Sequence, residues 1–300
     1  MRAIVLVSML AAAAPGDAVA APVLAAAGDV ACEPGRPSTP VECQQGATAA
    51  EIERARPTVV AALGDSQYAE GTLGEFSGPG SFDQTWGAFK SRIRPALGNH
   101  EYGSSPTAAG YFEYFGAGAG PAGRGYYSYN LGAWHVIVLN SSCTDTECSD
   151  RDLDGSTTSR QLSWLRSDLA HHRARCVLAY WHHPLFSSVR MLNDETGIRP
   201  LWDVLLAAKA DVVLNGHAHN YERFAAQNAA GAPRRTGLHE FVVGTGGRSH
   251  LAFDSKVHTS RFRDDKDFGV LFLTLHRSSY DWKFRTVNGK VVDRGSARCH

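Results

Sequence analysis

The sequence has no excess of charge of either sign, because its 30 lysines and arginines are balanced by 30 aspartates and glutamates. Without net charge, the chain has no general attraction for nucleic acid or for an anionic membrane, and we expect neither as a partner. It also lacks internal repeats and, after residue 20, any apolar run long enough to span a bilayer. An ordinary composition, with 43% hydrophobic residues in 300, predicts a globular protein of one large domain or two small ones.

The N-terminal segment differs in character from the rest of the chain. Arg2 precedes an apolar run over residues 3–14, a Pro-Gly pair breaks that run, and Ala18–Ala20 forms a small-x-small cleavage site. This order is typical of a secretory signal peptide over residues 1–20, which predicts a secreted or extracytoplasmic protein with its folded domain over residues 21–300. A first buried helix or a membrane anchor is the alternative, although the run is too short to cross a bilayer.

Cysteine pairs separated by two residues are absent, which argues against a cysteine-bound zinc site or a thioredoxin-like redox site. The chain has 6 cysteines, an even number that predicts disulfides in an exported protein. Fifteen pairings of six cysteines are possible. We favour two short local loops and one bridge from the C-terminus to a core strand, with buried free thiols as the alternative. The favoured pairs are Cys32–Cys43, Cys143–Cys148 and Cys176–Cys299.

Short apolar runs that end in a glycine or a polar cluster recur along the chain and predict buried strands. The runs are Val23–Ala27, Thr58–Leu63, Pro95–Leu97, Cys176–Trp181 and Val212–Leu214. Helical patterns separate several of them. The Thr48-Ala49-Ala50-Glu51 capping box predicts a helix over residues 48–56. Three further helices are indicated by apolar faces at Trp86, Phe89 and Ile93, at Leu162, Leu165 and Leu169, and at Leu201, Val204 and Leu205. Strands that alternate with helices are typical of an α/β fold.

The pattern changes elsewhere to consecutive strands, so we expect mixed sheets with an antiparallel C-terminal part. A hairpin is predicted over Tyr126–Asn130 and Trp134–Asn140, and later strands over Glu240–Val243, Val270–Leu275, Asp281–Thr286 and Lys290–Asp293. Residues 71–80, 116–125 and 226–237 are expected to be loops. The polar segment Gly246–Asp267 is too long for an idle connection, and we expect it near a functional site.

Metal-ligating side chains follow five of the predicted strands. They are Asp29, Asp65, Asn99, His100, His182, His217 and His219. Ligands bind outside the carboxyl ends of strands in open α/β sheets, so these side chains are expected to lie together. Carboxylate, amide and imidazole donors suit hard or borderline ions, and they are too many for one tetrahedral zinc. Two ions about 3.5–4 Å apart, bridged by a shared carboxylate, would use the whole set.

Five motifs in this order resemble those of the calcineurin-like metallophosphoesterases, and within them the purple acid phosphatases. They are Gly28-Asp29, Gly64-Asp65-Ser66-Gln67-Tyr68, Gly98-Asn99-His100-Glu101, Tyr180-Trp181-His182-His183-Pro184 and Gly216-His217-Ala218-His219-Asn220-Tyr221-Glu222-Arg223. The wider family usually has Asp-x-His at the first motif, where this chain has Ala31. The purple acid phosphatases also lack that histidine and carry a Gly-Asp-x-x-Tyr motif, which Tyr68 completes.

The resemblance implies a four-layer α-β-β-α sandwich and a dinuclear metal centre in a metallophosphoesterase catalytic domain over residues 21–300. By motif, the first ion would be bound by Asp29, Asp65, Tyr68 and His219, and the second by Asp65, Asn99, His182 and His217. Asp65 would bridge the two ions. A tyrosinate ligand favours Fe(III) at the first site, whereas the second site would take Zn, Fe or Mn.

The resemblance also assigns roles to residues that are not ligands. His100 is the candidate general acid or leaving-group contact, with a purely orienting role as the alternative. His183 is a candidate phosphate contact or a packed residue. Plant and animal purple acid phosphatases have a further histidine after the fourth motif, and residues Phe186–Asn193 have none. Arg248, His250 and His258 are candidates to replace it, although we interpret them as surface residues.

The implied function is an exported phosphatase that hydrolyses small-molecule phosphate monoesters by attack of a metal-bound hydroxide on phosphorus. A phosphodiesterase with the same metal core is the first alternative, and an inactive binding module of the same fold is the second. A further motif, Asp150 to Asp154, has the spacing of a calcium-binding loop. Its twelfth position is Gln161 rather than a bidentate carboxylate, so an acidic solvated loop is the favoured interpretation.

Overall fold

A computed structural model describes residues 20–142, 159–193 and 196–300. Its first sheet has six strands in the order β13-β12-β11-β1-β2-β3. These are β1 (Val23–Ala27), β2 (Val59–Leu63), β3 (Ile93–Ala96), β11 (Gly269–Leu275), β12 (Ser279–Thr286) and β13 (Val291–Arg298). Strands β1 to β3 are parallel, whereas β11 to β13 are antiparallel and join the sheet through an antiparallel pairing of β11 with β1.

The second sheet has seven strands in the order β10-β8-β9-β7-β6-β5-β4. They are β4 (Tyr127–Leu131), β5 (Trp134–Val138), β6 (Cys176–Tyr180), β7 (Val212–Asn215), β8 (Tyr221–Phe224), β9 (His239–Val243) and β10 (Ser260–Asp264). Its centre, β5-β6-β7-β9, is parallel, and antiparallel strands flank it on both sides. The mixed sheets and the predicted hairpin over β4 and β5 are therefore confirmed.

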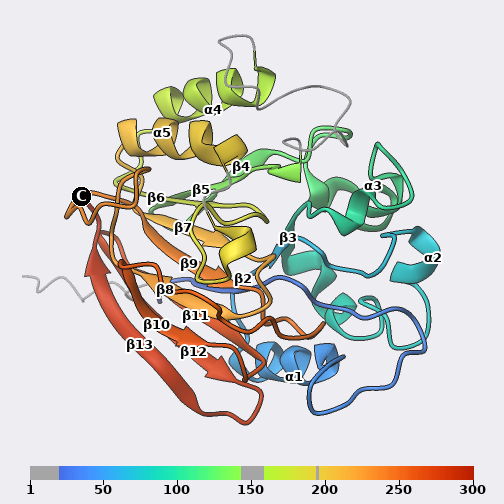
Figure 1. Cartoon of the computed structure of the whole chain (residues 1–300). Coiled ribbons are helices and arrows are strands. Elements are labelled where there is room, and N and C mark those ends of the chain that lie inside the picture. Colours follow the sequence, from blue (N-terminus) through green and yellow to red (C-terminus); the bar gives the residue numbers. More distant parts are fainter. Residues whose placement is uncertain (1–19, 143–158, 194–195) are drawn as a thin grey trace, which may run out of the picture.

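The two sheets pack on each other, and helices cover their outer faces (Figure 1). Helix α1 (Gln45–Ala55) packs against β11 and β12 of the first sheet. Helices α4 (Arg160–His171) and α5 (Arg199–Ala207) cover the second sheet. This is the predicted four-layer sandwich. Shorter helices are α2 (Leu73–Phe76), α3 (Ala109–Phe115) and the 3-10 helices η1 (Trp86–Arg92), η2 (His100–Tyr102), η3 (Gly116–Ala119), η5 (Arg190–Leu192) and η6 (Thr196–Ile198).

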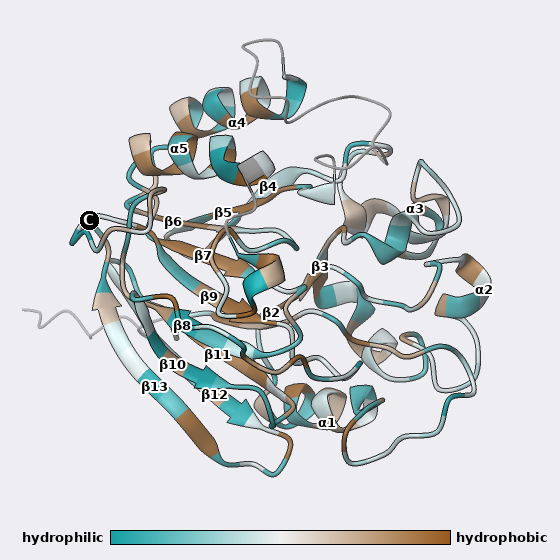
Figure 2. Ribbon diagram, in the orientation of Figure 1, coloured by the Kyte–Doolittle hydropathy of each residue, from teal (hydrophilic) through white to brown (hydrophobic). Residues whose placement is uncertain are grey.

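Apolar residues are concentrated in the central strands, as Figure 2 shows. Strands β2 and β6 are buried along their whole length because each has neighbours on both edges and layers on both faces. One apolar cluster fills the space between the sheets, and a second lies under α4 and α5, where Leu162, Leu165 and Trp202 face the sheet. The helical periodicity of these two segments is therefore explained by burial of one face.

The helix predicted over residues 48–56 begins earlier, at Gln45, and its capping box is not formed. The Thr48 hydroxyl instead donates to the carbonyl oxygens of Gln45 and Gly246, at 3.1 and 2.6 Å. Glu51 forms an ion pair with Arg285, whose Nε lies 2.6 Å from its carboxylate. Tertiary partners therefore take both side chains away from the helix end. A capping box does form at α2, between Thr72 and Glu75.

Three other local predictions are corrected. The segment around Trp86 and Phe89 is the 3-10 helix η1, and Ile93 belongs to β3 because its side chain is needed in the sheet core. The expected loops 71–80 and 116–125 contain α2 and η3. The polar segment 246–267 contains the edge strand β10, whose buried and exposed positions alternate too weakly in hydropathy to be recognised.

Two of the three favoured disulfides, Cys32–Cys43 and Cys176–Cys299, are formed, with Cα–Cα distances of 5.3 and 5.5 Å. The Cys143–Cys148 pair, the calcium-loop motif at Asp150 to Asp154 and residues 1–19 of the leader lie outside the described residues. Among the described helices, none is long and apolar enough to cross a membrane.

Candidate metal centre

The carboxyl ends of the parallel strands in the two sheets meet at one edge of the sandwich. Backbone hydrogen bonds join them there: Asp29 N donates to Gly64 O at 3.1 Å, and Gly216 N donates to His182 O at 2.9 Å. A third bond, from Gly28 N to Val243 O at 2.9 Å, crosses from one sheet to the other. The residues that follow β1, β2, β3, β6 and β7 are therefore brought to a common site, as the sequence predicts.

The first donor group surrounds the Tyr68 hydroxyl. This oxygen lies 3.0 Å from Asp29 Oδ1, 2.9 Å from Asp65 Oδ2 and 3.0 Å from His219 Nε2. His219 Nε2 also lies 3.1 Å from Asp29 Oδ1. The four side chains come from three different loops, and their donor atoms converge on one point.

The second donor group shares Asp65 with the first. His182 Nε2 lies 3.2 Å from Asp65 Oδ2 and 3.2 Å from His217 Nδ1. Asn99 follows β3, and its Oδ1 atom is buried without a hydrogen-bond partner. An orphaned acceptor and two imidazole nitrogens that face each other are explained if a cation binds between them.

The spacing of the donors fits metal ions. Ligands at neighbouring positions of an octahedral ion, with bonds of about 2.1 Å, lie about 3 Å from one another. The separations around Tyr68 are 2.9 to 3.1 Å, and those around His182 are 3.2 Å. The set of oxygen and imidazole donors is also one that binds hard and borderline ions. The residues present therefore fit the pair of ions that the sequence motifs imply.

The backbone at this edge is strained. Asp29, Asp65, His217 and His219 all have positive φ angles, at 59°, 48°, 67° and 47°. Non-glycine residues rarely adopt this left-handed region, and such outliers cluster at functional sites. The strain turns each side chain out of the strand direction and toward the others.

Two glycines next to the candidate ligands allow ligand side chains from neighbouring loops to come this close. Gly64 has a φ of +87°, and a Cβ added there would lie 2.6 Å from His182 Nδ1. A Cβ added at Gly98 would collide with the carboxylate of Asp65. The glycines that precede the ligands in two motifs therefore leave space for ligands from neighbouring loops.

Electrostatics of the protein groups favour an ionised Asp65 and a charged His182. Burial raises the pKa of the Asp65 carboxyl. The charge and hydrogen bond of His182 lower it by more than burial raises it, so the net pKa lies well below its usual range. Burial lowers the pKa of His182, whereas Asp65 raises it, and the net pKa is about 9. Burial also raises the pKa of Asp29, and His219 overcomes this effect and lowers it.

Other groups at the site are held neutral. Burial and the neighbouring His182 lower the pKa of His217 to about 4. Burial, His217 and His182 lower the pKa of His183 well below its usual value. Burial raises the pKa of Tyr68 well above 10, and the carboxylates of Asp29 and Asp65 raise it further. Without a cation, Tyr68 therefore stays a phenol.

Glu101 supports the site, and the sequence analysis gave it no role. Its buried carboxylate accepts backbone hydrogen bonds from Asp65 N at 2.9 Å, Ser66 N at 2.6 Å and Gly98 N at 2.7 Å. Burial and the adjacent Asp65 raise its pKa to about 7. Its position directly after Asn99-His100 in the third motif is the sequence feature that points to it.

Two serines orient histidines of the site and were also missed. Ser249 Oγ lies 3.0 Å from His219 Nδ1, and Ser141 Oγ lies 2.9 Å from His183 Nδ1. Ser249 belongs to the polar segment 246–267, which was expected near a site. Ser141 follows β5 and has no distinguishing sequence pattern.

His100 lies beside Tyr68 of the first donor group, and His183 lies beside His217 of the second. His100 Nδ1 lies 2.6 Å from the Ala69 carbonyl oxygen, its ring packs 4.2 Å from that of Tyr68, and its Nε2 is 3.9 Å from Asp65 Oδ2. About a third of the His100 side chain is exposed, at 34%. The His183 ring is buried 4.3 Å from that of His217.

Arg248 and His250 are not simple surface residues, which corrects the interpretation from sequence. The Arg248 guanidinium lies 5.0 Å from the centre of the Tyr68 ring, and its side chain is only 17% exposed. His250 Nδ1 lies 3.2 Å from the carbonyl oxygen of His219. The segment that contains both residues hydrogen bonds to the loop after β1, because Arg248 N donates to Asp29 O at 2.9 Å.

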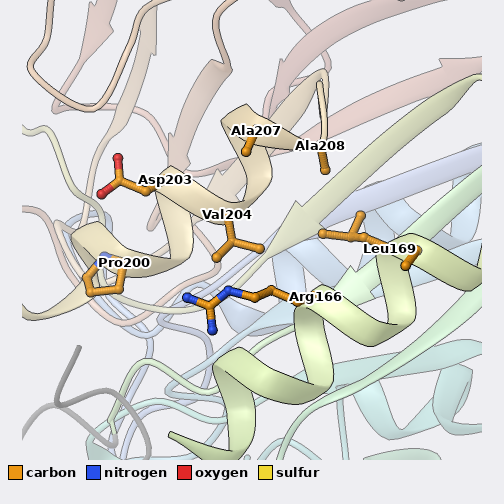
Figure 3. A pocket seen from close by; sticks show the side chains of 8 residues that line it. Arg166, Leu169, Pro200, Asp203, Val204, Ala207 and Ala208 are labelled. Atoms are coloured by element: carbon orange, nitrogen blue, oxygen red, sulfur yellow. The ribbon is translucent and has the colours of Figure 1, made fainter. Parts of the chain in front are cut away.

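A hollow of about 740 Å³ lies between α4 and α5, on the outer helical layer (Figure 3). Leu169 and Val204 form its apolar floor, and Arg166 and Asp203 stand at its rim. None of the candidate site residues lines it. The hollow is therefore separate from the metal centre.

The two mixed sheets and the donors at their carboxyl ends are consistent with a metallophosphoesterase fold, and sequence comparison agrees. The chain belongs to the calcineurin-like phosphoesterase family, whose sequence model matches residues 24–221. Its curated relatives include purple acid phosphatases of Arabidopsis thaliana. "Probable inactive purple acid phosphatase 9" is 27% identical over 241 residues, which cover 64% of this chain and 34% of the relative. "Purple acid phosphatase 18" is 26% identical over 200 residues, which cover 60% of this chain and 44% of the relative.

Solved structures give the same fold. A purple acid phosphatase from seeds of yellow lupin (Lupinus luteus) superimposes with a TM-score of 0.75 at 19% identity, over 92% of this chain and 53% of the lupin chain. The chain spans less than half the length of the two curated relatives described above. It is similar to purple acid phosphatases within the wider family, as its Gly-Asp-x-x-Tyr motif indicates.

Proposed function

We propose that the chain is a metal-dependent phosphatase that hydrolyses small-molecule phosphate monoesters outside the cytoplasm. The observation that carries this proposal is the convergence of six donor side chains from both sheets on two adjoining points that share Asp65 Oδ2. The predicted leader and the two disulfides support an extracytoplasmic location.

Asp29, Asp65, Tyr68 and His219 would bind the first ion, and Asp65, Asn99, His182 and His217 the second. When bound, the ions supply Lewis acidity, which lowers the pKa of coordinated water and neutralises charge on the phosphoryl oxygens. Fe(III) at the Tyr68 site, with Zn, Fe or Mn at the other, is supported by the phenol oxygen, which is a ligand for a trivalent ion once deprotonated.

The contacts of His100 support a role for it in handling the proton of the leaving group. Its Nδ1 donates to Ala69 O at 2.6 Å, which orients the ring and directs Nε2 toward Asp65. Because the side chain is partly exposed, Nε2 is accessible to a substrate oxygen. We propose that Nε2 delivers a proton to that oxygen as the ester bond breaks. His183 is buried and is proposed as a phosphate contact beside His217.

The first experiment measures metal content, visible spectrum and hydrolysis on the same purified sample. We expect about two ions per chain, and faster hydrolysis of p-nitrophenyl phosphate than of bis(p-nitrophenyl) phosphate. His217→Ala should abolish hydrolysis without unfolding the chain. His276→Ala is the matched control, because His276 pairs with Asp281 on the surface.

Faster hydrolysis of the diester would replace the monoesterase by a phosphodiesterase with the same centre. A folded protein that cannot be loaded with metal and hydrolyses neither ester would instead be a binding module. The name of one relative, "probable inactive purple acid phosphatase 9", makes this comparison necessary. The complete donor set of this chain argues for activity.

A further inference from the structure

A second cluster of metal-ligating side chains lies at the other end of the second sheet. His135 is near the start of β5, Asp168 is on the last turns of α4, and His172 directly follows that helix. One donor atom from each lies within 4.8 Å of the other two. The metal centre is at the carboxyl ends of the strands, so this cluster is distinct from it.

Asp168 is the hub of the cluster. Its Oδ2 lies 2.6 Å from His135 Nε2, and its Oδ1 accepts from Ser128 Oγ at 2.7 Å and lies 3.2 Å from His172 Nδ1. Burial raises the pKa of the carboxyl, but hydrogen bonds from His135 and Ser128 lower it below its usual value. The group is thus a carboxylate at neutral pH, which is the form that binds metals.

The second ring nitrogen of His135 is already supported by Asn130. His135 Nδ1 lies 3.0 Å from Asn130 Oδ1, so a proton on Nδ1 leaves Nε2 with a lone pair for an ion. Metal-binding histidines usually donate their other ring N–H to an oxygen in this way. In the absence of an ion, His135 faces an oxygen acceptor on both sides and can satisfy both only by carrying two protons.

His172 is the solvent-exposed member of the cluster, through which an ion could enter. Its side chain is 43% exposed, whereas that of His135 is 1% exposed. The two rings stack 4.3 Å apart over the same carboxylate, at 13°. His172 Nδ1 lies 2.9 Å from the backbone oxygen of Asp168 and 3.2 Å from Asp168 Oδ1, so the ring has to rotate to present a nitrogen to an ion bound by His135 and Asp168. The Asp168/His172 spacing of i, i+4 on a helix end brings both side chains to one face, and the helix C-terminus favours a cation.

From this geometry we propose that His135, Asp168 and His172 form a further binding site for a divalent transition-metal ion such as Zn²⁺. Two imidazoles and a carboxylate are ligands that zinc accepts, with water at the fourth position. Binding replaces the proton on His135 Nε2, which is released to solvent, while Nδ1–H continues to donate to Asn130.

The expected effect of the ion is structural. Gln161 at the start of α4 pairs with the backbone of Asn140, through bonds of 2.8 and 2.9 Å, just beyond the end of β5. The zinc site would fasten the other end of α4 to the start of β5. Both ends of the helix would then be fixed to one strand, and the site would act without taking part in hydrolysis.

The test is equilibrium dialysis of the full chain against micromolar Zn²⁺, with zinc counted by elemental analysis after the main centre is saturated. We expect the wild-type chain to bind one more zinc than His172→Ala. His171→Ala is the matched control, because His171 is the neighbouring exposed histidine, and its Nδ1 contacts the carbonyl of Ser167 as that of His172 contacts Asp168.

Thermal unfolding gives an independent readout. Zn²⁺ should raise the Tm of the wild type and of His171→Ala by more than that of His172→Ala. Equal zinc content and equal Tm shifts in wild type and His172→Ala would overturn the proposal. Loss of one zinc in both histidine variants would also overturn it, because the ion would then bind the helix end in general and not this cluster.

Discussion

Tyr68 is the residue whose chemistry depends most on a bound cation. Its hydroxyl lies between two carboxylates, at 3.0 and 2.9 Å, and burial raises its pKa well above 10. Deprotonation of the Tyr68 hydroxyl in such surroundings requires a strong positive charge. A bound trivalent ion would provide that charge and would lower the pKa of the hydroxyl. With Fe(III) at this site, as proposed, the visible absorption of the loaded protein would report directly on this side chain.

We predict that Tyr68→Phe removes the visible charge-transfer band of the iron-loaded protein, because the phenolate that donates charge is gone. The absorption spectrum and the iron content are measured on the same sample. An unchanged band in a variant that still holds iron would rule out Tyr68 as the ligand. Tyr129→Phe is a control, since Tyr129 is a partly buried tyrosine outside the site.

The buried His239 is expected to make the stability of the fold decrease in acid. Burial and the nearby Arg223 lower its pKa to about 3, whereas it is 6.5 in an unfolded chain. Between these values the unfolded state binds the proton and the native state does not, so stability decreases as the pH falls from about 6.5 toward about 3. The full effect is on the order of several kcal/mol.

His239→Gln should therefore make stability less dependent on pH. We expect the slope of unfolding free energy against pH, between pH 6 and 4, to fall by about 1 kcal/mol per unit relative to wild type. Urea unfolding at several pH values measures it. His258→Gln, which changes a histidine in the polar segment, should keep the wild-type slope; equal slopes in all three proteins would contradict the assignment.

Helix α2 has only four residues, yet it anchors the chain beyond Tyr68. The Glu75 carboxylate accepts from Ala69 N at 3.1 Å and from Thr72 N at 3.0 Å, while Thr72 Oγ1 accepts from Glu75 N at 3.1 Å. The carbonyl of Ala69 in turn contacts His100. The capping box thus fixes a segment that the candidate general acid relies on.

Glu75→Ala should lower the free energy of unfolding by about 1–3 kcal/mol, because partly buried N–H groups lose their acceptor. Chemical denaturation measures this change. Glu53→Ala is a suitable comparison, since Glu53 is exposed on α1. A loss no larger than that of the comparison variant would show that Glu75 is not needed to hold the segment.

Sequence patterns predict an element well when burial alone decides its conformation. Strands β1, β2, β6 and β7 lie in the middle of sheets, and their apolar runs identify them. Elements whose conformation depends on tertiary partners are harder to predict from sequence. Thr48 and Glu51 match a capping box, yet they contact Gly246 and Arg285 instead. Strand β8 is hidden because Tyr221 and its neighbours also belong to the last ligand motif.

The same distinction applies to the candidate site. Its ligands follow strand ends, so order along the chain predicts that they meet. Supporting contacts depend on which loops become neighbours, and Ser141 beside His183 or Arg248 over Tyr68 has no signature in local sequence.

The Cys176–Cys299 disulfide joins a central strand to the end of the chain and closes a loop with a sequence separation of 123 residues. A loop of this length lowers the entropy of the unfolded chain by an amount worth about 4–5 kcal/mol. We predict that the double variant Cys176→Ser/Cys299→Ser loses about 2–5 kcal/mol of stability, measured by urea unfolding under non-reducing conditions. The shorter Cys32–Cys43 loop, with a separation of 11, should matter less. A larger loss on removing the shorter loop would contradict the entropic account.

Strand β1 pairs on one side with β2 and on the other with β11, where Val23 lies opposite Thr274. The second edge of this central strand is thus covered only when β11, far along the sequence, pairs with it. Until then the sheet that carries Asp29 is open to strand exchange with other chains. Closure of this sheet therefore depends on a contact between segments far apart in sequence, and such non-local pairing slows folding and leaves a strand edge unpaired for longer.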